Sequence, residues 1–183
     1  APHVENPRDY PFGIRVKQPV ETDAIVITGS RKNVTSWEPW MDDVVSLIRT
    51  SEAEIYGICF GHQIICAAFG GTVERDEKNH AFMAEVTYAN GTKVNQLFTH
   101  QEFVTNSGEM KVVASTEHCK IAACRHPTKP IRSVQFHPEA VEDVLDYALN
   151  CGDMSEQERR SFGDANQDQD VASALIYAEG MFD

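Results

Sequence analysis

The sequence lacks the features that place a chain at a membrane or on a nucleic acid. No apolar run approaches the roughly 20 residues that span a bilayer, and no charged-then-apolar signal segment opens the chain. The net charge of −12 argues against a basic face of the kind that binds nucleic acid. We therefore expect a protein with no membrane partner and no nucleic-acid partner.

Patterns for metal, phosphate and redox sites are also missing. The seven histidines show no H-E-x-x-H or similar spacing, and no G-x-x-x-x-G-K-[ST] phosphate loop occurs. We predict neither a metal nor a cofactor. The five cysteines form no C-x-x-C pair, and an odd count of this kind fits reduced thiols in the cytoplasm. We interpret Cys66, Cys119 and Cys124 as small core residues.

At 183 residues the chain suits one domain with a substantial core. We assign residues 1–150 to that domain and residues 151–183 to an acidic, partly helical C-terminal extension. Within the extension we expect two helical stretches, 155–160 and 170–180, on either side of a polar linker over 163–169. The acidic side chains of the C-terminal third are interpreted as a solvated face.

Hydrophobic periodicity in the first part of the chain predicts alternating strands and helices. Residues 24–28 form a continuous apolar run, which is typical of a strand buried on both faces. The β-α-β-α rhythm favours a parallel sheet with helices on both sides. The predicted strands are 12–16, 24–28 and 55–58, and the predicted helices are 39–50 and 63–69.

The pattern then changes to one that favours antiparallel strands. The pair Asn90-Gly91 predicts a tight hairpin turn between strands over 84–89 and 92–98. Shorter strands are predicted further on, followed by a helix. The ranges are 111–115, 120–124 and 131–136 for the strands, and 141–149 for the helix.

The segment Gly57-Ile58-Cys59-Phe60-Gly61-His62-Gln63 is the most informative in the chain. A strand leads directly into Cys59 and a helix follows, as in a nucleophile elbow with sulfur in place of the serine hydroxyl. The helix N-terminus favours the thiolate, and free backbone N–H groups there can hold a developing oxyanion. We interpret His62 as a first-turn residue with a local hydrogen bond.

A second motif, His137-Pro138-Glu139, can supply a base and its orienting carboxylate. Side chains two positions apart in an extended chain point to the same side, and Pro138 favours an extended conformation at His137. The spacing therefore suits a histidine that takes and gives a proton while a carboxylate fixes its tautomer. A histidine-proline-glutamate sequence on its own is also typical of a turn.

With both motifs, the chain resembles the class I (triad) glutamine amidotransferases, and in particular the stand-alone group that is similar to the glutaminase domain of GMP synthase. The matching segments are 27–30, 57–63, 99–104 and 133–139. The resemblance implies an α/β fold with an open, mostly parallel (flavodoxin-like) sheet flanked by helices. The predicted hairpin adds an antiparallel region to that sheet.

The resemblance also implies roles for individual residues. It makes Cys59 the nucleophile, His137 the general base and acid, and Glu139 the orienter. Backbone N–H groups of Gly29 and Phe60 are the implied oxyanion donors, and the implied substrate is glutamine or a γ-glutamyl compound. The substrate-binding residues that it implies are Gly29, Ser30, Phe60, Gln63, His100, Gln101 and Glu102.

Three functions are open on the sequence. The first is a glutaminase that hydrolyses the glutamine side-chain amide through a Cys59 thioester and releases ammonia for a separate synthetase subunit. The second is a γ-glutamyl peptidase or hydrolase with the same triad. The third is a non-catalytic binding module of this fold.

The N-terminal segment departs from the family pattern. The family fold usually has an apolar strand and a helix before the segment that matches residues 23–28, whereas only 22 residues precede Asp23 here. We expect either a truncated N-terminus or an unusual sheet edge. Because a missing strand leaves backbone groups unpaired, we hypothesise that the C-terminal extension or a second chain covers that edge.

Overall fold

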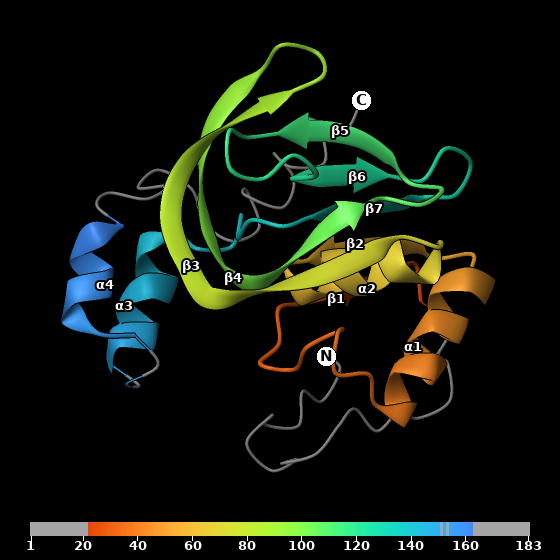
Figure 1. Cartoon of the computed structure of the whole chain (residues 1–183), viewed down its shortest axis with the longest axis horizontal. Coiled ribbons are helices and arrows are strands. Elements are labelled where there is room, and N and C mark those ends of the chain that lie inside the picture. The colour runs from red at the N-terminus through yellow and green to blue at the C-terminus, as the bar shows by residue number, and fades with distance from the viewer. Residues whose placement is uncertain (1–21, 151, 153, 163–183) are drawn as a thin grey trace.

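The computed structural model describes residues 22–150, 152 and 154–162, which form a seven-stranded sheet with four helices (Figure 1). The strands are β1 (Ala24–Ile27), β2 (Glu54–Ile58), β3 (Thr72–Tyr88), β4 (Lys93–Asn106), β5 (Lys111–Ser115), β6 (Ala123–Arg125) and β7 (Ile131–Val134). The helices are α1 (Pro39–Thr50), α2 (Phe60–Ala68), α3 (Glu142–Asn150) and α4 (Glu156–Ser161).

The sheet is open and mixed, with the strand order β1-β2-β7-β6-β5-β3-β4. Strands β1, β2 and β7 run parallel to one another, and the remaining neighbours pair antiparallel. The predicted α/β class is confirmed, although the antiparallel part extends beyond a single hairpin. Among the described residues β1 lies at an edge, and Val26 is 48% exposed. The prediction that this strand is buried on both faces is therefore wrong for that part of the chain.

Two apolar clusters lie on opposite faces of the sheet. Ile55 and Ile131 pack with α1 and α2, whereas Ile58 and Val134 pack with residues of β3, β4 and β5. Ile55 and Ile58 lie three residues apart on β2, as Ile131 and Val134 do on β7. Because side chains alternate along a strand, residues an odd number apart point to opposite faces. In the described part of the chain, helices α1 and α2 cover one face and the hairpin covers the other.

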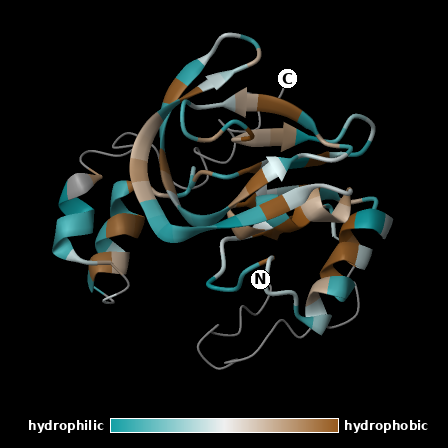
Figure 2. Ribbon diagram, viewed as in Figure 1, coloured by the Kyte–Doolittle hydropathy of each residue, from teal (hydrophilic) through white to brown (hydrophobic). Residues whose placement is uncertain are grey.

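The long β3–β4 hairpin turns at Asn90-Gly91, as predicted, and Gly91 has the positive φ of 88° that favours glycine. Its strands have 17 and 14 residues, far more than predicted. The register shifts between Arg75 and His80, and extra residues in one strand of a pair bend it. Figure 1 shows the hairpin curving across the sheet, and Figure 2 shows hydrophilic residues along the bend. This polar stretch has no apolar alternation, so the sequence pattern did not reveal it.

The other predicted elements are found with shifted ends. Helix α1 has the predicted bounds and begins with a proline, which suits a first helical position. Helix α2 begins three residues before the prediction, directly after Cys59. Strand β5 matches the prediction, β6 begins three residues late, and α3 and α4 are each shifted by one residue.

Helix α4 belongs to the predicted extension but packs on the same core. Phe162 follows α4 and is 4% exposed, in a cluster with Leu97 of β4 and Leu145 of α3. Arg159 of α4 also binds Asp146 of α3, with 2.7 Å between Nε and Oδ1. Figure 1 shows the two helices side by side at one end of the sheet. The beginning of the extension is therefore joined to the sheet through apolar contacts and to α3 through an ion pair.

Several predictions fall outside the described residues. They are the strand over 12–16, the linker over 163–169, the helix over 170–180, and the hypothesis that the extension covers the sheet edge. Within residues 22–150, 152 and 154–162, none of the helices combines the length and apolar character that crossing a membrane requires.

Candidate active site

Strand β2 delivers Cys59 into a sharp turn that starts α2. Cys59 has φ 53° and ψ −102°, and no other non-glycine residue in the described ranges has a positive φ. This backbone region is unfavourable for residues with a side chain and persists only where packing enforces it. A Cβ on Gly61 would lie 2.0 Å from the carbonyl oxygen of Ile27. Glycine at this position therefore lets the helix approach β1 closely enough to hold the turn.

The Cys59 sulfur is buried between β4 and the chain that follows β7. Its thiol donates a hydrogen bond to the carbonyl oxygen of Thr99 at 3.6 Å, and Nε2 of Gln135 donates to the sulfur at 3.8 Å. The N–H of Cys59 donates to the Val134 carbonyl oxygen at 2.8 Å. Sequence reasoning did not select Gln135, although it lies two residues before His137 in an extended segment, where side chains share one side.

His137 and Glu139 form the pair that their spacing predicted. Nδ1 of His137 lies 2.7 Å from Oε1 of Glu139, and the His137 N–H donates to the carbonyl oxygen of Leu97 at 2.8 Å. Nε2 of His137 is buried and has no hydrogen-bond partner of good geometry among the described residues. This nitrogen is therefore the ring atom free to exchange a proton with a reacting group.

The electrostatics of His137 link it to Cys59. Burial acts to lower its pKa, but the contact with the Cys59 sulfur, the hydrogen bond to Glu139 and the charges of both groups raise the pKa to about 10. A Cβ placed on Gly29 would lie 3.3 Å from Cε1 of His137 and 3.7 Å from Cβ of Cys59. The fold therefore brings Cys59, His137 and the backbone of Gly29 to one place, and the raised pKa favours the protonated form of His137 at neutral pH.

Phe60 contributes its backbone at this place. It is the first residue of α2, so its N–H has no acceptor within the helix. The positive end of the helix dipole also lies here, next to Cys59. The Phe60 ring is buried and packs against Trp40, with 5.9 Å between ring centroids. Any part that Phe60 plays in binding a reacting oxygen therefore falls to its N–H.

Gln63 is buried and makes its hydrogen bonds within the protein. Its Nε2 donates to the carbonyl oxygen of Glu102 at 2.7 Å and to Oε1 of Gln135 at 3.3 Å. Since Gln135 in turn donates to the Cys59 sulfur, a chain of hydrogen bonds runs from β4 to the candidate nucleophile. The substrate contact expected of Gln63 stays a prediction.

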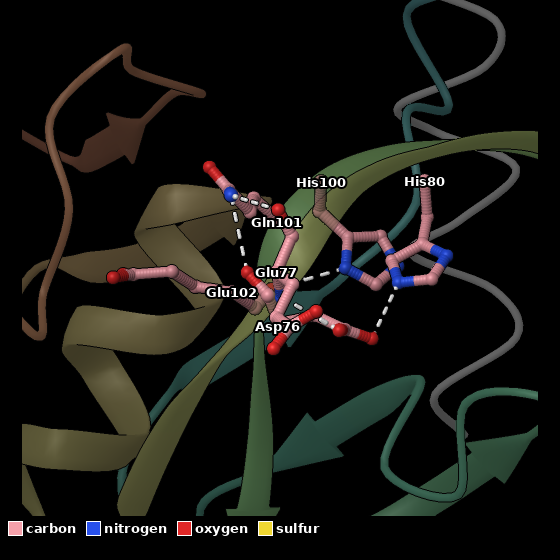
Figure 3. A network of polar contacts seen from close by, with 6 residues as sticks. All are labelled: Asp76, Glu77, His80, His100, Gln101 and Glu102. Carbon is pink, nitrogen blue, oxygen red and sulfur yellow. Dashed lines mark hydrogen bonds and ion pairs between the residues drawn. The ribbon is translucent and has the colours of Figure 1, made fainter.

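His100, Gln101 and Glu102 of β4 point in different directions (Figure 3). Nε2 of Gln101 donates to the carbonyl oxygens of Asp76 and Glu77, at 3.1 and 3.3 Å, and so ties β4 to the bend of β3. The Glu102 side chain extends away from His100, as Figure 3 shows. These three neighbours therefore do not line a common surface.

His100 is a neutral histidine beside the candidate site. Burial lowers its pKa to about 4, against the effect of its hydrogen bond to the Glu102 carbonyl oxygen, and the charges of His80 and His137 lower it further. Its Nδ1 lies 3.0 Å from that carbonyl oxygen, so the neutral ring donates there. Its Nε2 is buried without a partner among the described residues.

The remaining two predicted substrate residues lie in or against the loop between β1 and α1. Glu102 is 3% exposed, and its carboxylate accepts the N–H of Val34 at 2.6 Å and the N–H of Thr35 at 3.2 Å. The Thr35 hydroxyl donates to the same carboxylate. Ser30 is exposed, and its Oγ accepts the N–H of Lys32 at 3.0 Å. The partners of both side chains lie within this loop.

One cluster has the residue types of a metal site. Ligand atoms of His62, Cys66 and Cys124 lie within 4.8 Å of one another. Both His62 nitrogens are already bonded, however, Nδ1 to Ser133 Oγ at 2.8 Å and Nε2 to the Ile121 carbonyl oxygen at 3.1 Å. Hydrogen bonding to Cys66 and burial raise the pKa of the Cys124 thiol, which keeps it protonated. We interpret the cluster as core, and the predicted local hydrogen bond of His62 is wrong because its partners are distant in sequence.

Comparison with known proteins places these motifs in a family. The family model of class-I glutamine amidotransferases matches residues 6–149. A subunit of a glutamine-hydrolyzing GMP synthase from Methanocaldococcus jannaschii is 35% identical over 126 residues, which cover 59% of this chain and 65% of that one. A glutamine amidotransferase-like protein from Schizosaccharomyces pombe is 29% identical over 157 residues, which cover 77% of this chain and 61% of that one. The matched segment thus spans less than two thirds of each relative.

A solved structure shares the fold. The crystal structure of a glutamine amidotransferase from Thermotoga maritima superimposes with a TM-score of 0.67 at 15% sequence identity. The match covers 91% of this chain and 76% of that one. At this identity the likeness shows a common fold.

Proposed function

Because this chain belongs to the class-I glutamine amidotransferase family, we propose that it hydrolyses the side-chain amide of glutamine through a γ-glutamyl thioester on Cys59. The observation that carries the proposal is the convergence at the elbow. Cys59 lies in a strained turn at a helix start, and His137, already paired with Glu139, lies with it around Gly29.

In the first step the Cys59 thiolate attacks the side-chain carbonyl carbon of glutamine, and a carbon–sulfur bond forms. A protonated His137 next to the sulfur stabilises the thiolate by its charge. The N–H groups of Phe60 and Gly29 donate to the oxyanion as it develops.

In the second step the carbon–nitrogen bond breaks. Nε2 of His137 gives its proton to the departing amine, which leaves as ammonia. The γ-glutamyl group then remains on Cys59 as a thioester. Neutral His137 then takes a proton from water as the water oxygen attacks the thioester. The carbon–sulfur bond breaks, glutamate leaves, and the thiolate and the protonated imidazole are restored. Glu139 accepts the Nδ1–H throughout and fixes the tautomer.

We propose that the ammonia passes to a separate synthetase subunit. Relatives that are each named as one subunit of a glutamine-hydrolyzing GMP synthase support this, because such a name implies a further subunit. In this proposal residues 1–150 are the glutaminase unit, and residues 151–183 an extension whose first helix packs against it. The described cysteines are free thiols, which supports a reducing, cytosol-like compartment.

The test compares the initial rates of hydrolysis of glutamine and of a γ-glutamyl dipeptide. Wild-type protein is expected to release ammonia and glutamate in equal amounts. Cys59→Ala is expected to lose at least about 1,000-fold in kcat, while the buried control Cys119→Ala keeps wild-type turnover. Dipeptide hydrolysis with negligible turnover of glutamine would instead identify a γ-glutamyl peptidase. Full activity in Cys59→Ala would reject the nucleophile.

A further inference from the structure

A buried carboxylate lies behind the loop that carries Gly29. Glu102 is 3% exposed, and burial of a charge is costly unless hydrogen bonds replace its water. Three donors do so here, namely the N–H groups of Val34 and Thr35 and the Thr35 hydroxyl. Because all three donors belong to the adjacent residues Val34 and Thr35, the carboxylate holds one short segment of the loop in place.

That segment is coupled to Gly29 through a compact stretch of chain. The Lys32 N–H donates to Ser30 Oγ at 3.0 Å, and the Ser36 N–H donates to the Asn33 carbonyl oxygen at 3.1 Å. Only residues 30–33 separate Gly29 from Val34, and the Lys32–Ser30 hydrogen bond lies within this short stretch. Gly29 itself adjoins His137 and Cys59.

The backbone of Glu102 is fixed from the other side. Its carbonyl oxygen accepts hydrogen bonds from Nε2 of Gln63 at 2.7 Å and from Nδ1 of His100 at 3.0 Å. Gln63 belongs to α2, the helix that begins directly after Cys59. Glu102 therefore joins the Gly29 loop to the helix that carries the nucleophile, and both implied oxyanion donors depend on elements that meet at this residue.

We propose that Glu102 is a positioning residue whose carboxylate holds the loop at Val34 and Thr35, so that the Gly29 N–H stays aimed at the oxyanion. The inference rests on the proposed glutaminase activity. It differs from the role implied by family resemblance, in which residues 100–102 line the α-amino and α-carboxylate end of the bound glutamine. A carboxylate that is 3% exposed and bonded to three internal donors is poorly placed to receive a substrate ammonium group.

The two roles predict different kinetics for Glu102→Gln, which keeps the shape but replaces one acceptor oxygen with a donor. If Glu102 positions the loop, kcat falls about 10–100-fold, since loss of an oxyanion donor lowers kcat. The fall is equal for glutamine and for glutaramate, which lacks the α-amino group, and inhibition by the product glutamate is unchanged. The control Glu85→Gln, an exposed residue of the same hairpin, keeps wild-type values.

Amide hydrogen exchange tests the hydrogen bonds between Glu102 and the loop directly, without any measurement of turnover. In Glu102→Gln the Val34 and Thr35 amides are expected to exchange at least about tenfold faster, whereas core amides such as that of Ile131 are unchanged. Thr35→Val removes only the hydroxyl donor and provides the same readout if Glu102→Gln does not fold. It should give a smaller fall in kcat, again equal for the two substrates.

Several outcomes would overturn the proposal. A raised KM for glutamine with unchanged kinetics for glutaramate assigns Glu102 to the substrate ammonium. Faster amide exchange at Val34 and Thr35 with unchanged kcat shows that the hydrogen bonds from Glu102 to the loop do not serve catalysis. A wild-type protein that turns over neither substrate instead overturns the proposed function, and is distinguished because the wild-type control fails.

Discussion

The pKa of His137 depends on its neighbours Cys59 and Glu139. The pKa of His137 is about 10 because the contact with Cys59, the hydrogen bond to Glu139 and the charges of both groups outweigh the effect of burial. His137 is thus held protonated at neutral pH next to a sulfur that must become a thiolate to react. Nε2 has no hydrogen-bond partner among the described residues and is available for proton transfer, while the 2.7 Å bond from Nδ1 to Glu139 fixes the ring.

We predict that Glu139→Gln lowers the pKa of His137, because it removes both the charge and the strong acceptor. A group whose pKa rises on folding, here from the ordinary 6.5 to about 10, contributes stability that is complete below pH 6.5 and is lost as the pH rises through 10. The stability difference between wild type and Glu139→Gln should therefore be larger at pH 6 than above pH 10, by about 2 kcal/mol. NMR titration of the His137 ring and urea unfolding at the two pH values measure both effects. An equal difference at both pH values would contradict the assignment.

Gly29→Ala should slow catalysis with little effect on folding. The added Cβ would lie 3.3 Å from the His137 ring, which displaces the ring or the loop, and misplacement by about 1 Å can cost 100-fold in rate. Gly29 is exposed and has no positive φ, so Tm should change little. Ser36→Ala, at an exposed position further along the same loop, is the control. Unchanged kcat in Gly29→Ala would show that the loop is not close to the reacting atoms.

Local spacing revealed one part of the site and could not reveal another. His137 and Glu139 are two residues apart, so the geometry of an extended chain was enough to predict their pairing. Glu102 lies 68 residues from Val34, its hydrogen-bond partner, and no periodicity encodes such a contact. The family resemblance implied that Glu102 binds substrate, and its internal hydrogen-bond partners became evident only from the fold.

At the scale of elements, the elbow depends on the close contact between α2 and β1. The predicted strand-turn-helix order was correct, but the helix begins at Phe60, directly after Cys59, rather than at Gln63. The Asn90-Gly91 turn could also be predicted, since the preference of these two residues for a tight hairpin turn is local. The bend of the hairpin could not, because it arises from a register shift between two long strands.

Gly61→Ala should destabilise the fold by about 2 kcal/mol or more, since its Cβ would lie 2.0 Å from the Ile27 carbonyl oxygen. The helix can relieve this overlap only by moving away from β1, which also disturbs Cys59. Urea unfolding measures the loss. Gly91→Ala is a useful comparison, because nothing lies within 4 Å of a Cβ there and its cost of about 1 kcal/mol comes from the positive φ alone. A smaller cost for Gly61→Ala than for Gly91→Ala would contradict this role of the close contact.

At the scale of the whole molecule, the far end of the described chain supports the site. Phe162 packs with Leu97 and Leu145, and the Leu97 carbonyl oxygen accepts the N–H of His137. The composition and the strand-helix rhythm were enough to predict one α/β unit. They could not predict that β3 and β4 cover the second face, because this depends on how a polar bend folds the hairpin over the sheet.

Phe162→Ala should therefore reduce both stability and catalysis. Removal of a buried phenylalanine side chain costs about 3 kcal/mol, and the cavity lies behind the strand that anchors His137. We expect a lower denaturation midpoint and faster amide exchange at His137. Tyr147→Ala, at a 64% exposed position of α3, should have a much smaller effect. Equal losses for the two variants would argue against a packed role for α4.

The central claim, that Cys59 carries the γ-glutamyl group, is tested most directly by the covalent intermediate. Protein mixed with glutamine is quenched in acid within the first turnovers, and its peptides are mapped by mass spectrometry. We predict a γ-glutamyl adduct on the peptide containing Cys59, lost on treatment with hydroxylamine and missing in Cys59→Ala. An adduct on Cys66 or another residue, persisting in Cys59→Ala together with glutamine turnover, would contradict the claim.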